Sequence, residues 1–309
     1  MPTTLPAPKP YTPFLSGDFR MELGLHALDL AEWIEVDVNL GRDLALKHEL
    51  LTQRPDEVFM ALPQADTGAA ETLALLVAHL VQHFPFIFEK EGDLLWNRST
   101  GACWDLAASG LHPLDLAGRL VQEDLCLMAE DPESGEYRLV GAAVCFPSRW
   151  RPAEKLGRNL DGIHGPVPRY EPNMSSPMQR FFAKVKPDRS VWRIGWSVAD
   201  SPDLFLPGQH GGAQSDVSHI TGANAGENLW LRVERQTLRR LPESGQILFT
   251  IRIYVTSLAD AARNPADAAD LAQSFRNMAP DFRAYKGITP VADAAIAWLD
   301  RAAEAKIHV

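Results

Sequence analysis

The stretch "NLWLRVERQTLRRLPESGQILFTIRIYVTSL" (Asn228–Leu258) decides the fold. Its two halves, Asn228–Pro242 and Gly245–Leu258, are rich in β-branched, aromatic and alternating polar residues, which predicts two β-strands. The "PESG" between them predicts a hairpin turn, in which Gly245 supplies the backbone freedom that a tight turn requires. The sequence therefore predicts an antiparallel pair of strands in this half of the chain.

Working outward, strand and helix patterns alternate without a βαβ order. Strands are expected at Ser190–Asp200, in a hairpin at Gly92–Leu106 with "RSTG" at its tip, and at Glu136–Trp150. Helical spacing of apolar residues is found at Glu71–Phe84, at His112–Glu130, at Ser176–Val185 (with Ser176 as the cap and Pro177 as the first helical residue) and in the Ala-rich tail from Asp260. These patterns predict an α+β protein with an antiparallel sheet.

Composition limits the function. The 309 residues are 46% hydrophobic and 23% charged, as expected for a globular protein with a substantial core. Thirty basic and 40 acidic residues give a net charge of −10, which argues against nucleic acid as the main partner. Neither a signal-peptide core nor a membrane-length apolar run is found in the sequence. We therefore expect a soluble, cytoplasmic protein that does not insert into a membrane.

The three cysteines, Cys103, Cys126 and Cys145, are far apart in the sequence. Without CxxC pairs they predict neither a disulfide framework nor a cysteine-ligated zinc or iron–sulfur site. Cys126 and Cys145 lie in apolar runs and are expected to be small buried hydrophobic residues. The motifs GxGxxG, GxxxxGK[ST], GxSxG and HExxH are also absent, so the common nucleotide-binding, hydrolase and protease signatures do not apply.

Two groups of histidines could hold a metal but lack support. His79 and His83 stand at i, i+4, a spacing that places both on one helix face, yet no third ligand is evident. The Gly-rich loop Gln209–His219 offers His210, Asp216 and His219, which in a loop are more often solvated polar residues.

His164, in "GRNLDGIHGPVPRY" (Gly157–Tyr170), is a stronger candidate within a segment that we expect to be mostly loop. Gly162 and Gly165 allow a flat group to approach the backbone, and the following prolines restrict the direction of the imidazole. A neutral imidazole held in this way is a suitable axial ligand for heme iron. The ordinary alternative, a histidine hydrogen-bonded within a turn, stays open.

Four basic residues precede His164, and they suit pairing with carboxylates such as heme propionates, although a solvated basic loop is the more common case. They are Arg149, Arg151, Lys155 and Arg158.

Strand alternation marks a possible ligand-lined face. In "VWRIGWS" it places Arg193, Gly195 and Ser197 on one face, where the glycine leaves room for a planar ligand and Arg193 is available to donate to a bound diatomic molecule. In the next strand, Arg232, Glu234 and Gln236 share one face and Val233, Arg235 and Thr237 the other. Charged residues on a strand of this kind predict either that they line a cavity or that the strand is an exposed edge strand.

Taken together, "AAVCFPSRWRPAEKLGRNLDGIHGPVPRY", "VWRIGWSVADSPDLF" and the opening hairpin resemble the heme-dependent oxidative N-demethylase α-subunit family, over roughly Pro85–Leu258. The resemblance implies a PAS-like fold, with an antiparallel sheet holding heme b against helices. It divides the chain into an N-terminal arm and helical extension (1–84), a heme-binding core (85–258) and a C-terminal helical segment (259–309).

The resemblance also implies an activity. The α subunit would be an oxygenase component, which oxidises dimethylamine or a similar small secondary amine with O2 and releases formaldehyde. Electrons would come from NADPH through a partner that carries FMN and a [2Fe–2S] cluster, and another partner would bind tetrahydrofolate. His164 would be the proximal heme ligand, with Arg193, Glu234 and Arg235 as candidate catalytic residues and Gly195 beside the heme.

A heme-binding gas or redox sensor, or a heme carrier, with the same fold is the alternative, because fold does not fix function. A different, larger N-methyl substrate is also left open. Were His164 not the ligand, His112, His210 or His219 would be the next histidines to consider.

Overall fold

The protein is represented by a computed structural model that describes residues 5–14, 23–208 and 216–305. Within these residues the larger sheet has seven strands in the order β1-β8-β9-β10-β6-β7-β2, and every neighbouring pair is antiparallel. Its strands are β1 (His26–Ala27), β2 (Phe59–Ala61), β6 (Asp124–Glu130), β7 (Tyr137–Ala143), β8 (Val191–Ala199), β9 (Trp230–Arg240) and β10 (Ile247–Ser257). The predicted α+β class with an antiparallel sheet is confirmed.

The opening stretch forms the longest pair of this sheet. β9 and β10 are hydrogen-bonded along eleven residues each, from Arg240 opposite Ile247 to Trp230 opposite Ser257. Gly245 has a φ of 70°, in the left-handed region that glycine adopts without strain, and it lets the chain reverse at "PESG". The predicted strands and turn are therefore confirmed.

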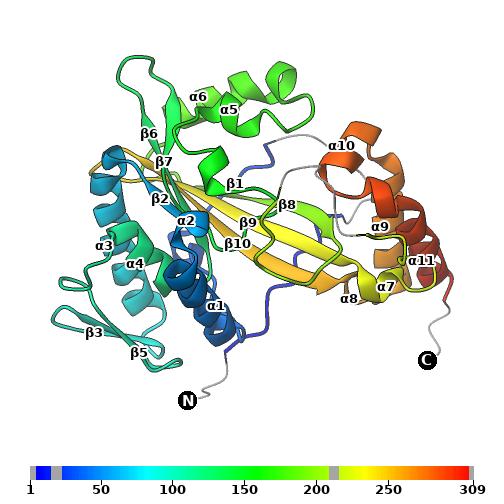
Figure 1. Ribbon diagram of the computed structural model, residues 1–309, viewed down its shortest axis with the longest axis horizontal. Coiled ribbons are helices and arrows are strands. Elements are labelled where there is room, and N and C mark those ends of the chain that lie inside the picture. The colour runs from blue at the N-terminus through cyan, green and yellow to red at the C-terminus, as the bar shows by residue number, and fades with distance from the viewer. Residues whose placement is uncertain (1–4, 15–22, 209–215, 306–309) are drawn as a thin grey trace.

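The helices lie in three groups around the sheet (Figure 1). At one end are α1 (Leu40–Gln53), α2 (Pro55–Val58), α3 (Asp66–His83) and α4 (Pro113–Leu120); over the sheet are α5 (Leu160–His164) and α6 (Ser176–Lys184); at the other end are α7 (Ala225–Asn228), α8 (Leu258–Ala261), α9 (Pro265–Asn277), α10 (Pro280–Tyr285) and α11 (Ala292–Glu304). Among the described residues, no helix is both long and apolar enough to cross a membrane.

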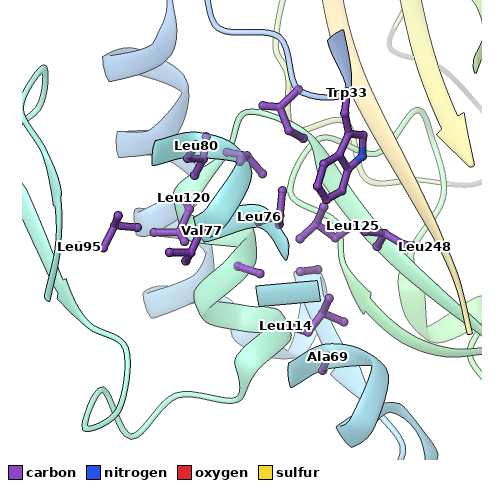
Figure 2. Close-up of a cluster of buried hydrophobic side chains, with 14 of the residues drawn as sticks. Trp33, Ala69, Leu76, Val77, Leu80, Leu95, Leu114, Leu120, Leu125 and Leu248 are labelled. Carbon is purple, nitrogen blue, oxygen red and sulfur yellow. The ribbon is translucent and has the colours of Figure 1, made fainter. Parts of the chain in front are cut away.

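One face of the sheet is covered at both ends. Figure 2 shows the first end, where Leu125 of β6 and Leu248 of β10 pack with Trp33 and with leucines of α3 and α4. At the other end, Trp196 of β8 stacks on Phe275 of α9, with ring centroids 5.9 Å apart. Each buried side chain of this size contributes roughly 1.5–3 kcal/mol through loss of apolar surface to water. These clusters fix the sheet between the two helical ends.

The opposite face is covered in part by α5 and α6 and, around Ile251 and Ile253 of β10, by a cluster that includes side chains of α1 and α2. Met178 and Phe182 of α6 and Leu160 of α5 pack against Cys126 and Leu238 on the strands. The remaining area of this face borders a cavity.

Three local predictions fail for identifiable reasons. The helix expected over His112–Glu130 ends at Leu120, and Asp124–Glu130 is the strand β6 instead. The first five residues of β6 are buried, so the strand is almost continuously apolar. Such a run also contains apolar residues at helical spacing, and periodicity alone does not distinguish it from a buried helix. The segment of His164 contains the helix α5 rather than only loop. Ser176 does not cap α6, because a π-helical turn (Glu171–Ser175) leads directly into it.

The predicted hairpin at Gly92–Leu106 is confirmed as β4 (Leu94–Asn97) and β5 (Ala102–Asp105), which form a separate small sheet with β3 (Phe88–Glu91). β1 and β2 precede residue 85 and yet belong to the larger sheet. The domain boundaries 1–84, 85–258 and 259–309 stay predictions.

Candidate functional site

A cavity of about 990 Å³ lies beside the partly covered face of the sheet. Its walls come from the strands β6 to β10, from α5 and α6, from the end of α10 and from the N-terminal arm at Tyr11–Pro13. In Figure 1, α5 and α6 lie above the sheet and α10 lies to their right. The volume is at the upper end of the roughly 300–1,000 Å³ that small-molecule and cofactor pockets occupy, so a large ligand fits.

His164 is the last residue of α5 and lines this cavity. Its Nδ1 lies 2.8 Å from the carbonyl oxygen of Leu160, one helical turn earlier. Because a carbonyl only accepts, Nδ1 carries the hydrogen and Nε2 keeps the lone pair. The ring also stacks on Tyr170, with centroids 4.8 Å apart and planes 15° from parallel. The imidazole is therefore fixed in orientation and tautomer, as in a metal-ligating histidine.

The sequence around His164 explains this placement. The side chain of Asn159 accepts a hydrogen bond from the backbone of Gly162 at 2.9 Å and so caps the start of α5. Pro166 follows the helix and lacks the amide hydrogen that would extend it. A five-residue helix thus ends on His164 at the cavity wall.

Burial, together with the positive charges of Lys155 and Arg193, lowers the pKa of His164 to about 4 against the opposing hydrogen bond to Leu160. The ring is consequently neutral at physiological pH. A neutral imidazole with a free Nε2 lone pair is the form that binds iron.

Across the cavity, the strand face carries the residues that alternation predicts. Gly195 of β8 stands opposite Glu234 of β9, and Arg193 opposite Gln236. All four line the cavity. A Cβ atom at Gly195 would lie 3.7 Å from Nε2 of Gln236 and 3.9 Å from Cβ of Glu234. The glycine therefore forms a shallow recess between polar side chains.

Glu234 is held by two donors. The hydroxyl of Ser148 donates to Oε1 at 2.6 Å, and Nε2 of Gln236 donates to Oε2 at 2.9 Å. Lys155, Arg193 and Arg232 each experience its negative charge. The carboxylate is therefore a fixed acceptor surrounded by cations.

Arg193 has one buried donor without a partner among the described residues. Its Nε is buried and makes no hydrogen bond there. Burial lowers the pKa of this guanidinium, while the charge of Glu234 opposes that effect. A buried polar group that lacks a protein partner is a common mark of a ligand site.

The predicted basic residues divide into two kinds. Arg149 and Lys155 line the cavity. Arg149 forms an ion pair with Asp200, and Lys155 lies over the ring of Trp150 at 4.0 Å. Burial lowers the pKa of Lys155. Arg151 and Arg158 are exposed and are not among the lining residues.

Arg235 lies on the face of β9 opposite Glu234, as the alternation indicates, and does not line the cavity. Its guanidinium donates to the backbone oxygens of Trp33 at 3.1 Å and Glu32 at 2.6 Å. Its Nε lies 3.5 Å from the carboxylate of Glu35. These contacts make Arg235 a structural residue between the sheet and the N-terminal segment.

Several lining residues were not predicted. Tyr285 and Lys286 extend from the end of α10, and Tyr11 comes from the N-terminal arm. Burial lowers the pKa of Lys286 to about 8, and its Nζ donates to the backbone oxygen of Trp196. The local sequence carries no signal for these residues, because they reach the cavity only through tertiary packing. Strand alternation, in contrast, places Arg232 on the same face as Glu234, and Arg232 lines the cavity too.

The other histidines do not form a metal site among the described residues, where no group of three suitable ligands occurs. His79 is buried against Trp33, at 5.3 Å between centroids. His112 caps α4, with its Nδ1 accepting from the backbone of Leu114. His219 and Asp216 are exposed, and His210 lies outside the described residues.

Comparison with known families agrees with this geometry. A family described as "HODM_asu-like: Haem-dependent oxidative N-demethylase, alpha subunit-like" has a sequence model that matches residues 24–296, which include every cavity residue discussed above except Tyr11–Pro13. The match extends well beyond the Pro85–Leu258 range of the resemblance, into both ends of the chain. The chain therefore belongs to the heme-dependent oxidative N-demethylase α-subunit-like family.

Proposed function

We propose that this protein is the oxygenase component of a heme-dependent oxidative N-demethylase that acts on a small secondary amine such as dimethylamine. The observation that carries the proposal is His164, which is neutral, fixed through Nδ1 and placed on the wall of a cavity of about 990 Å³. The family's heme dependence supports heme as the ligand.

The cavity residues fit heme b. His164 would hold the iron through Nε2. Apolar side chains of α5, α6 and β6 suit the porphyrin ring, among them Leu160, Met178, Phe182 and Met128. Lys155 and Arg149 would pair with the two propionates, since both line the cavity and carboxylates favour such partners. Gly195 would leave room for the ring against the strands.

When bound, heme supplies the redox chemistry by which O2 and two externally supplied electrons oxidise a methyl group. With two protons, dimethylamine and O2 then yield methylamine, formaldehyde and water, one oxygen atom entering each of the last two products.

The chain's own polar groups would orient the amine. Glu234, fixed by Ser148 and Gln236, would accept a hydrogen bond from the amine nitrogen. Arg193 would place its unpartnered Nε–H donor and a positive charge where negative charge develops on oxygen. Because such donors are already in position, no free energy is needed to reorient them during the reaction.

Electrons must come from another protein. The α-subunit name implies a multi-subunit enzyme. We propose a partner that carries FMN and a [2Fe–2S] cluster, reduced by NADPH, and a tetrahydrofolate-binding partner that receives formaldehyde. The free cysteines, two of them buried, support a reducing cytoplasmic setting, where disulfides are rare.

The test measures formaldehyde. The heme-loaded chain is reduced chemically and mixed with O2 and dimethylamine, and larger N-methylamines are compared under the same conditions. Release of formaldehyde in proportion to the amount of amine consumed supports the proposal. A ferrous protein that takes up O2 without releasing formaldehyde from any N-methylamine contradicts it and supports the sensor or carrier function instead.

A further inference from the structure

Positive charge is concentrated in one part of an acidic chain. Residues 149–193 contain ten Lys or Arg and four Asp or Glu, a net +6, whereas the whole chain has a net charge of −10. The remaining residues therefore carry −16. This basic segment includes His164 and α6, so the asymmetry coincides with the cavity wall.

α6 separates the cavity from solvent. Met178, Phe181 and Phe182 face the cavity, and Arg180 and Lys184 on the same helix are exposed. Figure 1 shows α6 at the upper margin of the ribbon beside α5. A helix with its side chains is about 10 Å across. The exposed charges are thus only about one helix diameter from the cavity.

The exposed cations Arg180, Lys184, Lys186 and Arg189 form what we call the α6 basic face. Among the described residues none of them makes an ion pair with a carboxylate, and only Asp188 interrupts the series in the sequence. The end of α6 is also firmly attached to the sheet, because Arg240 donates to the backbone oxygens of Val185 at 2.7 Å and Phe182 at 2.6 Å. The charges therefore stand on a rigid support.

We propose that the α6 basic face is the docking surface for an acidic electron-donor protein. The inference rests on the proposed function, which requires external electrons to reach the cavity. An acidic donor is attracted to this face and repelled by the rest of the chain, so charge both speeds the encounter and orients it. The face also brings the donor to the cavity wall formed by α6, which lies beside the helix α5 that carries His164.

The test uses a reduced plant-type [2Fe–2S] ferredoxin as an acidic one-electron probe. In the heme-loaded chain carrying Lys184→Glu and Lys186→Glu, the second-order rate constant of heme reduction should fall at least about tenfold at low ionic strength. The dissociation constant for ferredoxin should rise in parallel. The wild-type rate should decrease as salt is added, while reduction by dithionite stays the same in both proteins.

The matched control reverses two exposed charges elsewhere, Lys90→Glu and Arg263→Glu, and should leave both constants within about twofold. Lys184→Arg with Lys186→Arg should also retain the wild-type values. Equal effects of the two charge reversals, or no effect of either, overturn the docking proposal. Formaldehyde release is measured separately with a chemical reductant. Absence of that activity in the wild type overturns the proposed function. The docking site is still tested by the rate and dissociation constants for ferredoxin.

Discussion

At the scale of single residues, the neighbours Glu234 and Arg235 show how alternation assigns roles. Glu234 faces the cavity and accepts two hydrogen bonds, and Arg235 faces the N-terminal segment and donates to backbone oxygens. The two side chains leave the same strand in opposite directions, as the period of a β-strand requires. Glu234 therefore lines the cavity, whereas Arg235 connects the sheet to the N-terminal segment.

Replacing Glu234 with Gln should weaken amine binding. The amide keeps the shape but loses the negative charge, and hydrogen bonds to charged groups contribute about 1.5–3 kcal/mol. We expect KM for dimethylamine to rise roughly ten- to a hundredfold with an unchanged heme spectrum. Steady-state formaldehyde release measures KM, and Glu234→Asp should recover part of the loss. An unaltered KM would remove Glu234 from the substrate site.

Replacing Arg235 with Gln should affect stability instead. Arg235 is 2% exposed, and its removal leaves Glu35 and two backbone oxygens with fewer donors in a buried place. Loss of one partner of a buried ion pair costs about 3–5 kcal/mol. Urea unfolding should show this decrease while KM of the heme-loaded variant stays at the wild-type value. A raised KM with normal stability would argue for a role in the cavity after all.

At the scale of elements, part of the site could be predicted and part could not. The period of two in β8 and β9 places Arg193, Gly195 and Glu234 on one face, because side-chain direction in a strand depends only on local geometry. Tyr285 and Lys286 come from α10, some 50 residues along the chain from β9, and no local pattern connects those elements. The strand β6 resembled a helix because it is buried on both faces.

Gly195 of β8 gives a test of the cavity wall. A methyl group there meets only ordinary contacts, the nearest at 3.7 Å, so Gly195→Ala should fold and bind heme almost normally. Gly195→Leu should extend into the cavity and weaken heme binding by about tenfold or more, since an overpacked site costs roughly 1–3 kcal/mol. Heme titration with a parallel melting curve separates the two effects. Equal heme affinity in both variants would place the heme elsewhere.

His79 of α3 gives the chain a pH-dependent stability. Burial, followed by the charges of His83 and Arg239, lowers its pKa from 6.5 to about 4. The unfolded chain therefore binds the proton more readily, and stability is fully present above pH 6.5 and lost as pH falls toward 4. This pKa difference corresponds to roughly 3 kcal/mol of unfolding free energy.

The variant His79→Phe, which retains a ring against Trp33, should lose correspondingly less unfolding free energy over the same pH range. Urea titrations of both proteins at several pH values measure the difference. Identical pH profiles would show that His79 is already protonated in the folded chain or equally buried when unfolded.

At the scale of the whole molecule, the cavity is assembled from segments that are distant in sequence. The N-terminal arm, the central strands, α5 with α6, and the end of α10 all contribute to it. The two hydrophobic clusters on the other face hold the sheet against α3 and α4 at one end and α9 and α11 at the other. The family match over residues 24–296 is consistent with this arrangement, because it includes both helical ends as well as the strands.

The sequence was sufficient to predict the class of fold, since this depends on patterns within short stretches. The same patterns singled out His164, which lines the cavity, and its role as heme ligand stays a prediction. It could not show that α5 would orient the imidazole through Leu160 or that Arg151 would point to solvent. Those outcomes depend on how the loop between β7 and α6 folds against the sheet, which involves contacts between residues far apart in sequence.

The most direct test of the account is the UV–visible spectrum of the heme-reconstituted chain and of His164→Ala, with His219→Ala as the control. The wild type and His219→Ala should bind one heme with the spectrum of a histidine-ligated iron. His164→Ala should bind heme at least about tenfold more weakly and regain the histidine-type spectrum when imidazole is added. A His164→Ala protein that keeps wild-type affinity and an unchanged histidine-ligated spectrum without imidazole would contradict the account.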